Sequence, residues 1–245
     1  MLSIRMRAVA DLVTDGLRVA DIGTDHGFVP IALVSEGRCP SAIAADVRSG
    51  PLSHAAENIR KHELSDVIET RLSDGLKKID PGEAEAVIIA GMGGMLMIRI
   101  LEEGQDVISA ARELILQPQS DIPQVRRWLN MNGFHIICER IALDAGKYYF
   151  MMKAVPGKGP EYDAADEQYG YCLLNAGDRL LQKYLEEEAG KLKDIRQALI
   201  IQTTEKSRQR LKEIDLLQQI NCAAQERNQK ALDRRDGSDD SSETD

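Results

Sequence analysis

Short apolar runs alternate with helical segments from residue 18 to about residue 155, and this alternation restricts the possible folds more than any other feature. Several runs are apolar at nearly every position, which is typical of strands buried on both faces of a parallel sheet. The strand candidates are residues 18–22, 41–47, 67–73, 85–91, 113–117, 135–143 and 148–155. With helical segments between them, the pattern predicts right-handed crossovers and a doubly wound α/β sheet.

The last two strand candidates are joined only by "DAGK" at 144–147, which is too short for a parallel crossover. They are therefore expected to pair as an antiparallel hairpin. A mostly parallel sheet with one antiparallel strand is typical of the methyltransferase variant of the Rossmann-like fold. In the helical segment 121–133 we expect Asp121 to be the N-cap and Gly133 to end the helix.

The pattern changes after "VPGKGPEYD" at 155–163, beyond which only helical spacing remains. One apolar stripe contains Leu181, Leu185, Leu192, Ile195 and Leu199, and the other contains Leu211, Ile214, Leu217 and Ile220. Between the stripes, Thr203 or Thr204 is a candidate helix cap. We expect two long antiparallel helices, a coiled-coil hairpin that serves either for packing and dimerisation or for gripping a substrate.

Three regions are therefore expected along the chain. Residues 1–156 form the α/β domain, residues 157–232 form the helical hairpin, and residues 233–245 form an acidic disordered tail.

Composition excludes several classes of protein. The net charge of −9 argues against indiscriminate coating of nucleic acid, although it allows a local basic face. No stretch approaches eighteen apolar residues, so no membrane span is expected. The first residues lack a secretion signal, which predicts a cytoplasmic location. The four cysteines form no CxxC pair and the histidines have no ligand spacing, so no metal site is expected.

Glycines and carboxylates follow the first two strand candidates. In "DIGTDHG" at 21–27, Gly23 allows a turn with positive φ, and Gly27 allows the next helix to pack closely on the sheet. Asp46 ends the second strand about twenty residues later, where a carboxylate can accept both hydroxyls of a ribose.

The third and fourth strand candidates end in similar signals. After the third, "SDGL" places Asp74 where it could face the amine of an adenine. After the fourth, "AGMGG" at 90–94 holds no bulky side chain against a ligand. The carboxyl ends of parallel strands share one edge, where open α/β sheets bind their ligands.

The charge at this edge favours a cationic cofactor. No complete G-x-G-x-x-G prepares a helix for a diphosphate, while Asp21, Asp25, Asp46 and Asp74 are all acidic. S-adenosyl-L-methionine carries a sulfonium and an ammonium, whereas NAD carries a diphosphate. The candidate residues for binding S-adenosyl-L-methionine are Asp21, Gly23, Thr24, Asp25, Gly27, Asp46, Val47, Asp74, Gly75, Leu76, Ala90, Gly91 and Met92.

The motifs "RVADIGTDHGFVPIALV", "GP" at 50–51, "SDGL", "AGMGG" and "GKYYFMMK" together resemble the TrmK-type bacterial tRNA (adenine-22-N1)-methyltransferases. The resemblance covers nearly the whole chain and implies methyl transfer from S-adenosyl-L-methionine to N1 of an adenine in tRNA. It also implies that the helical hairpin recognises tRNA. The chain departs from the expected pattern at "QPQS", residues 117–120, where we expect an asparagine.

Two groups of residues are candidates for the reaction and for the substrate. Asp25 is expected between cofactor and target base, where it holds the cofactor ammonium or accepts from the adenine amine, and His26 orients Asp25 or caps the helix. The candidates for tRNA contacts are Arg5, Arg7, Gln117, Gln119, Arg126, Arg127, Lys147 and Lys153. They can act together only if they share the face that carries the strand ends.

Other functions stay open at this point. The same fold and cofactor could act on another RNA base or on a small molecule, or the chain could be a non-catalytic dimerisation module. A nicotinamide-dependent dehydrogenase is disfavoured by the missing phosphate fingerprint. The oligomeric state is not determined by the sequence.

Overall fold

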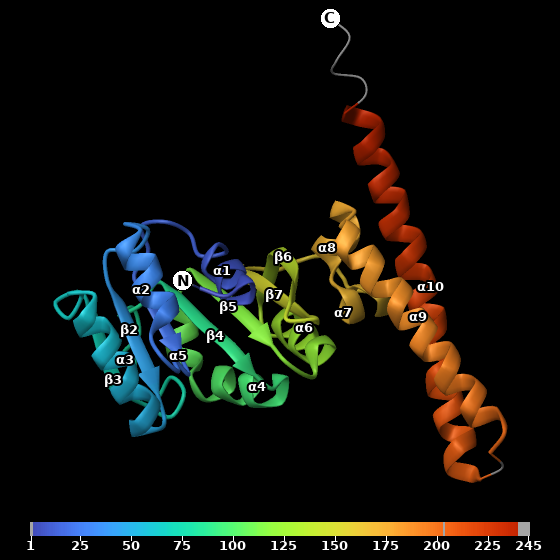
Figure 1. Cartoon of the computed structure of the whole chain (residues 1–245), viewed down its shortest axis with the longest axis horizontal. Coiled ribbons are helices and arrows are strands. Elements are labelled where there is room, and N and C mark those ends of the chain that lie inside the picture. The colour runs from blue at the N-terminus through green and yellow to red at the C-terminus, as the bar shows by residue number, and fades with distance from the viewer. Residues whose placement is uncertain (1, 203, 240–245) are drawn as a thin grey trace, which may run out of the picture. The chain divides into compact units, whose positions relative to one another are not determined.

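The computed structural model describes residues 2–202 and 204–239 of the chain. The chain forms two compact units, the first ending at Glu161 and the second starting at Tyr162. Figure 1 labels their helices and strands. The boundary lies shortly after Pro156, the last residue of the final strand.

The first unit contains a seven-stranded sheet with the order β3-β2-β1-β4-β5-β7-β6. The strands are β1 (Val19–Ile22), β2 (Ala42–Asp46), β3 (Ile68–Leu72), β4 (Ala86–Met92), β5 (Glu113–Pro118), β6 (Phe134–Asp144) and β7 (Lys147–Pro156). Strands β1 to β5 pair in parallel, and β7 is antiparallel to both β5 and β6. The predicted Rossmann-like methyltransferase sheet, with one antiparallel strand, is confirmed.

Helices cover both faces of this sheet. They are α1 (Ile4–Ala10), α2 (Phe28–Ser35), α3 (Ser49–Lys61), α4 (Gly94–Glu103), α5 (Gln105–Ala110) and α6 (Ile122–Met131). On one face, Val9 of α1, Val29 of α2 and Ile59 of α3 share a core with Val19 and Ile88 of the sheet. On the other face, α4 packs on β4 and contacts α5 and α6. Because both faces are covered, every residue of β1, β2 and β5 is buried.

The helix α6 begins after Asp121 and ends before Gly133, as predicted. Gly133 follows it with φ of 78°, which suits a glycine at the end of a helix. Asp121 occupies the N-cap position with φ of 52°, but its side chain makes no hydrogen bond to the helix. Its carboxylate accepts instead from the Ser120 hydroxyl at 2.7 Å. Asp121 is therefore the N-cap residue as predicted, although its side chain does not bond to the helix.

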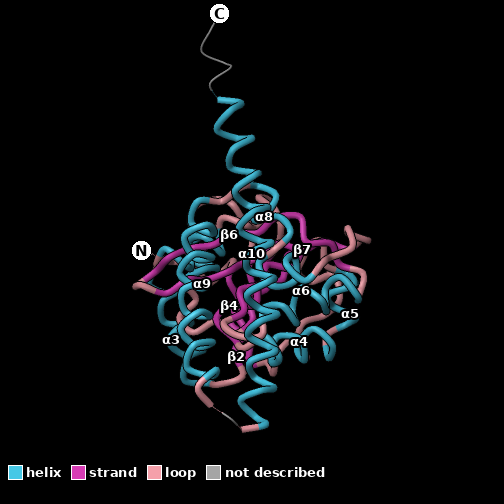
Figure 2. Tube along the Cα trace, turned by 90° about the vertical axis from the view of Figure 1, so that its right-hand side faces the viewer, coloured by secondary structure: helices cyan, strands magenta, loops and turns pink. Residues whose placement is uncertain are grey.

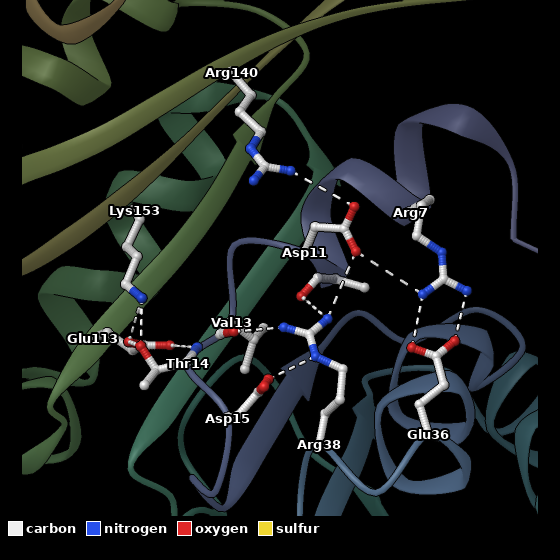
Figure 3. A network of polar contacts seen from close by, with 11 residues as sticks. Arg7, Asp11, Val13, Thr14, Asp15, Glu36, Arg38, Glu113, Arg140 and Lys153 are labelled. Atoms are coloured by element: carbon white, nitrogen blue, oxygen red, sulfur yellow. Dashed lines mark hydrogen bonds and ion pairs between the residues drawn. The ribbon is translucent and has the colours of Figure 1, made fainter.

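A network of charged side chains holds the C-terminal end of α1 (Figure 3). Arg38 donates to the carbonyls of Ala10 and Val13 at 3.1 and 2.8 Å. The Asp11 carboxylate lies 3.6 Å from both Arg38 and Arg140. These contacts fix the C-terminal end of α1. Because the helix is rigid, they also define the position of its N-terminal end, which contains Arg5.

The described part of the second unit is helical (Figure 2). It contains α7 (Ala164–Tyr169), α8 (Tyr171–Ala176), α9 (Arg179–Ile200) and α10 (Glu205–Asp239). The helices α9 and α10 lie side by side as the predicted hairpin, whereas the short α7 and α8 were not predicted. Thr204 accepts a hydrogen bond from the Ser207 amide, as a cap should, and Thr203 lies outside the described residues.

Two buried asparagines one heptad apart on α10 bond to the rest of this unit. Asn221 donates to the Leu185 carbonyl at 3.1 Å. Asn228 accepts from the Asp178 amide at 3.0 Å and donates to the Asp178 carbonyl at 3.1 Å. A buried polar residue at such positions fixes the register between paired helices.

The predicted start of the disordered tail, residue 233, is wrong because the helix α10 continues to Asp239. Residues 233–239 are helical, because contacts of α10 continue beyond Leu232, which is buried. Arg235 donates to the Gly177 carbonyl at 3.3 Å, and Asp236 pairs with Arg179 at 3.1 Å. The remaining residues of the predicted tail, 240–245, lie outside the described residues.

Candidate functional site

A cavity of about 870 Å³ opens at the carboxyl edge of the sheet, around the ends of β1 and β4. The strand order reverses between these two strands, and open α/β sheets bind ligands at this point. Of the predicted cofactor residues, the cavity is lined by Asp21, Gly23, Thr24, Asp25, Gly27, Asp46, Val47, Asp74, Gly75, Ala90, Gly91 and Met92. The motifs after the first four strands therefore form one site.

Leu76 does not line this cavity. Its side chain is buried and packs against Gly104, where a Cβ would overlap it. The side chain of Leu76 therefore packs in the core and does not face the cavity, and its predicted cofactor contact has no support from the cavity lining.

The turn after β1 has the geometry that its glycines allow. Gly23 has φ of 81°, and its amide donates to the Ala45 carbonyl of β2 at 2.8 Å. A Cβ at Gly23 would collide with the methyl group of Met92 at the end of β4. Gly27 has φ of 69° and lies against α3, where its Cβ would meet that of Ala55 at 3.4 Å. Both glycines bring backbone close to neighbouring elements.

Two buried carboxylates lie deep in the cavity. Asp21 and Asp46 are 6% and 4% exposed. Burial raises the pKa of Asp21 to about 6, and the nearby Asp46 carboxylate reinforces this effect. Oδ1 of Asp46 accepts from the Arg48 amide at 2.7 Å, and among the described residues Oδ2 has no partner. A bound cation would lower the free-energy cost of ionising the buried Asp21 carboxyl group. Oδ2 of Asp46 can accept hydrogen bonds from hydroxyl groups.

These donors and acceptors fit the cofactor that the sequence predicts. The Thr24 hydroxyl is buried, and no described residue meets it with hydrogen-bond geometry. A carboxylate at the end of β2, an acidic floor and a backbone turn without side chains suit a ribose and a cationic amino acid.

The other two carboxylates lie at the rim. Asp25 is 63% exposed, and Asp74 is 51% exposed. Asp74 pairs with Lys77 Nζ at 2.6 Å, which lowers the pKa of its carboxyl group. Asp25 lies 3.4 Å from Nε2 of His26.

The His26 ring belongs to a stack of three rings at the mouth of the cavity. Its centroid lies 5.3 Å from that of Phe28 and 5.6 Å from that of His54. The backbone carbonyl of His26 accepts a hydrogen bond from Asn58 Nδ2 at 3.0 Å, which connects the turn after β1 to α3. The contacts of Phe28 and His54 with His26 could not be predicted from the sequence, because they depend on how α2 and α3 pack.

Only two of the predicted tRNA contacts, Arg5 and Gln119, line the cavity. Gln117 is fully buried and accepts a hydrogen bond from Arg5 at 2.8 Å. A direct contact between Gln117 and a substrate is therefore contradicted. Arg127 and Lys147 are exposed on α6 and at the start of β7, outside the cavity lining.

Three other basic candidates are engaged within the protein. Arg7 donates to both carboxylate oxygens of Glu36 at 2.8 and 2.7 Å. Arg126 is 1% exposed and donates to Glu139 at 2.7 Å. Lys153 is largely buried and lies 2.9 Å from the Glu113 carboxylate. The predicted tRNA contact of Arg126 is contradicted because its side chain is buried. Arg7 and Lys153 pair with carboxylates of the same unit and do not line the cavity, so we do not expect them to contact a nucleotide bound there.

Sequence reasoning missed part of the lining. Leu96, Arg99 and Ile100 contribute from α4. Their spacing of three and four residues after "GMGG" places them on one helix face, and this was a usable signal. The rest of the lining consists of Leu2, Ser3, Met6, Ile22, His26, Phe28, Val29, Arg48 and Ser73, together with the predicted tRNA contacts Arg5 and Gln119. The N-terminal residues carry no comparable signal, since only tertiary packing brings them to the strand ends.

The described residues contain neither a metal-binding cluster nor a membrane-spanning helix. No group of three or more His, Cys, Asp or Glu side chains is arranged to hold a metal ion. None of the described helices has the length and hydropathy needed to cross a membrane.

Comparison with known proteins places the chain in a family. Residues 2–152 match the methyltransferase domain family. The tRNA (adenine(22)-N(1))-methyltransferase of Bacillus subtilis strain 168 is 33% identical over 219 residues, which are 87% of this chain and 92% of that protein. The chain belongs to the tRNA (adenine(22)-N(1))-methyltransferase family.

Solved structures of the tRNA (adenine(22)-N(1))-methyltransferase family extend the comparison. The crystal structure of the B. subtilis m1A22 tRNA methyltransferase TrmK matches with a TM-score of 0.84 and 31% identity, covering 92% of this chain and 99% of that chain. Streptococcus pneumoniae Sp1610, solved in complex with S-adenosyl-L-methionine, matches with a TM-score of 0.78 and 32% identity, covering 95% and 100%. Both matches extend beyond the sheet domain into the helical unit.

Proposed function

We propose that this protein transfers a methyl group from S-adenosyl-L-methionine to N1 of adenine 22 in tRNA. The observation that carries the proposal is the acidic cavity at the ends of β1 to β4, in a chain that belongs to this family. The cofactor supplies a methyl group that its sulfonium makes electrophilic.

The residues of the cavity divide the binding of this cofactor between them. Asp46 accepts from the ribose hydroxyls through its unpartnered oxygen. Asp21 provides buried negative charge for the cationic part, and Gly23 leaves the backbone open to close approach. Asp74 lies at the rim of the cavity, where it faces the adenine of the cofactor.

Adenine N1 already holds an in-plane lone pair, so the protein does not need a base to create the nucleophile. Its task is to align N1, to exclude water and to stabilise the positive charge that the base gains. Asp25 is the carboxylate at the cavity rim that can accept from the adenine amine, and His26 holds Asp25 in place at 3.4 Å. An adenine stacked inside folded tRNA must be extruded to reach this depth.

The helical hairpin of α9 and α10 is the second part of the proposal, as the unit that recognises tRNA. The segment around its turn is rich in basic side chains, Lys193, Arg196, Lys206, Arg208, Arg210 and Lys212. Among the described residues, Lys193, Lys206 and Lys212 have no ion-pair partner. Replacing these three lysines by alanine should weaken tRNA binding and flatten its dependence on salt. An unchanged salt slope would exclude the hairpin. Such a substrate also implies a cytoplasmic location.

The proposal is tested by incubating the protein with labelled S-adenosyl-L-methionine and unmodified tRNA, followed by nucleoside analysis. We expect label in N1-methyladenosine, and none with a transcript that carries guanine at position 22. Label in another nucleoside would favour a different RNA target. Calorimetry with the cofactor alone addresses the remaining alternative, since a non-catalytic module with a decayed pocket would bind none.

A further inference from the structure

Among the described residues, three arginines line the cavity, and they differ in how their charge is compensated. Arg48 lies 3.6 Å from the Asp46 carboxylate, and Arg99 lies 3.9 Å from that of Glu103. No described carboxylate lies within ion-pair distance of the Arg5 guanidinium. Arg5 therefore brings an uncompensated, half-buried positive charge to an otherwise acidic cavity.

Neutral groups hold the guanidinium of Arg5 in place. Nη1 donates to Oε1 of Gln117 at 2.8 Å, and the guanidinium carbon lies 5.3 Å from the centre of the Tyr149 ring. Gln117 is fully buried, and its Nε2 donates to the Pro118 carbonyl at 3.1 Å, so the orientation of its amide is fixed. The Arg5 amide donates to the Asp144 carboxylate at 3.1 Å. The side chain is thus oriented without losing its charge.

The guanidinium lies against the end of β4. A Cβ at Gly91 would stand 3.3 Å from Nη1 of Arg5 and 3.8 Å from Nε2 of Gln119. The buried acidic groups, Asp21 and Asp46, come instead from the ends of β1 and β2. The cavity is therefore divided by charge, with the carboxylates on one side and Arg5 on the other.

We propose that Arg5 binds a phosphate of the target nucleotide, and that Gln117 and Tyr149 are the residues that position it. The inference rests on the proposed tRNA substrate and adds the group of the substrate that Arg5 recognises. An extruded nucleotide brings its own phosphate to the enzyme. A guanidinium matches a phosphate in both charge and geometry. The sulfonium and ammonium of the cofactor and a cationic methylated base would be repelled by Arg5. The cofactor also carries a carboxylate, so a raised Kd for S-adenosyl-L-methionine in Arg5→Ala would assign Arg5 to that group and overturn the inference.

Arg5→Ala and Arg7→Ala form a matched pair for the test, because both remove one charge from α1. Arg7 bonds to Glu36 and does not line the cavity. With full-length protein, saturating cofactor and varied tRNA, Arg5→Ala should raise KM for tRNA about tenfold or more. It should also reduce the salt slope of tRNA binding by about one. Arg7→Ala should change neither quantity, and both variants should bind S-adenosyl-L-methionine with the wild-type Kd.

Gln117→Glu is a second variant for the test. If Arg5 only stabilised the fold, this substitution would leave KM for tRNA unchanged. A glutamate at this position still accepts from Arg5 but neutralises its charge, so KM for tRNA should rise as in Arg5→Ala while cofactor affinity is retained. Equal effects of Arg5→Ala and Arg7→Ala, or a normal KM in Arg5→Ala, would overturn the inference. Failure of the wild-type protein to methylate any tRNA would instead overturn the proposed function, and the inference with it.

Discussion

The Arg5 guanidinium donates to the Gln117 side chain at 2.8 Å, and this bond joins α1 near the start of the chain to the buried end of β5. Arg7 lies only two positions later, yet it points to Glu36. Residues two positions apart do not share a helix face, so two similar arginines have different environments. One contributes to the cavity and the other fastens α1 to the domain.

The buried Asp21 makes cofactor binding dependent on pH. Its folded-state pKa of about 6 lies above the ordinary value of 3.8. Binding of a cation favours the ionised form, so at pH values below the raised pKa the carboxyl group must release a proton before the cation is stabilised. We expect affinity for S-adenosyl-L-methionine to rise with pH and to level off above about pH 7. Calorimetry in buffers of different ionisation enthalpy measures both the affinity and the proton release.

The same shift has the opposite consequence for stability without cofactor. Since the folded state holds the Asp21 proton more tightly than the unfolded state, this group stabilises the fold at low pH. That contribution falls as pH rises through about 6. Asp21→Asn should remove both pH dependences. A variant that kept the wild-type proton release would show that another group titrates.

The exposed carboxylate of Asp25 is predicted to act on turnover. Asp25→Ala should lower kcat by about tenfold to a hundredfold, because a charge beside the developing cation is lost. Asp66→Ala provides a control, since Asp66 is also exposed but does not line the cavity. Single-turnover methylation with saturating tRNA gives the rate directly. Wild-type turnover and cofactor affinity in Asp25→Ala would remove this residue from the mechanism.

Gly94, the first residue of α4, tolerates no side chain. A Cβ there would lie 2.5 Å from the Ser120 carbonyl oxygen and 2.8 Å from that of Asp121, both backbone atoms. Gly94→Ala should therefore destabilise the protein by about 2 kcal/mol or more. Gly50, in the first turn of α3, has open space around it, so Gly50→Ala should be neutral or slightly stabilising. Chemical denaturation of the two variants compares them. Similar midpoints would contradict the packing argument.

For the buried ion pair of Arg126 and Glu139, removing one partner is predicted to lower stability more than replacing both. Their side chains are both 1% exposed and lie 2.7 Å apart. Arg126→Ala leaves a buried carboxylate without this partner and should cost about 3–5 kcal/mol of unfolding free energy. The double variant Arg126→Met with Glu139→Leu should recover most of that loss. Urea unfolding of the single and double variants measures the difference, and additive losses would contradict the prediction.

In the helical unit, Asn228 is predicted to fix the start of α9 against α10. It is fully buried and bonds to both backbone groups of Asp178 and to Gln182. Asn228→Ala leaves these groups without a partner and should lower stability by about 1–3 kcal/mol. The neighbouring Gln229 is exposed and bonds only to Asp233 among the described residues, so Gln229→Ala should have little effect. Hydrogen exchange along α9 and α10 reports the change locally, and equal protection in both variants would contradict it.

The sheet could be predicted from the sequence because its signals are local. Strands buried on both faces, such as residues 114–116 at the centre of β5, are apolar, and a four-residue connection allows only a hairpin between β6 and β7. The cavity residues after β1 to β4 could be predicted for the same reason. Parallel strands place their carboxyl ends at one edge whatever the details of packing.

The basic residues could not be sorted in this way. Arg5, Arg7 and Arg126 look alike in the sequence, but one lines the cavity, one pairs with Glu36 and one is buried with Glu139. Their partners come from distant parts of the chain. The short helices α7 and α8 and the extension of α10 to Asp239 were missed because contacts between helices sustain them.

The sequence alone determined the order of the strands along the chain, the sign of charge in the cofactor cavity and the presence of a helical hairpin, since periodicity and strand ends are properties of neighbouring residues. The tertiary structure decided which basic side chains pair with a carboxylate and which, like Arg5, do not. Ion pairing acts over a few ångströms of space, and distance along the chain does not reveal it.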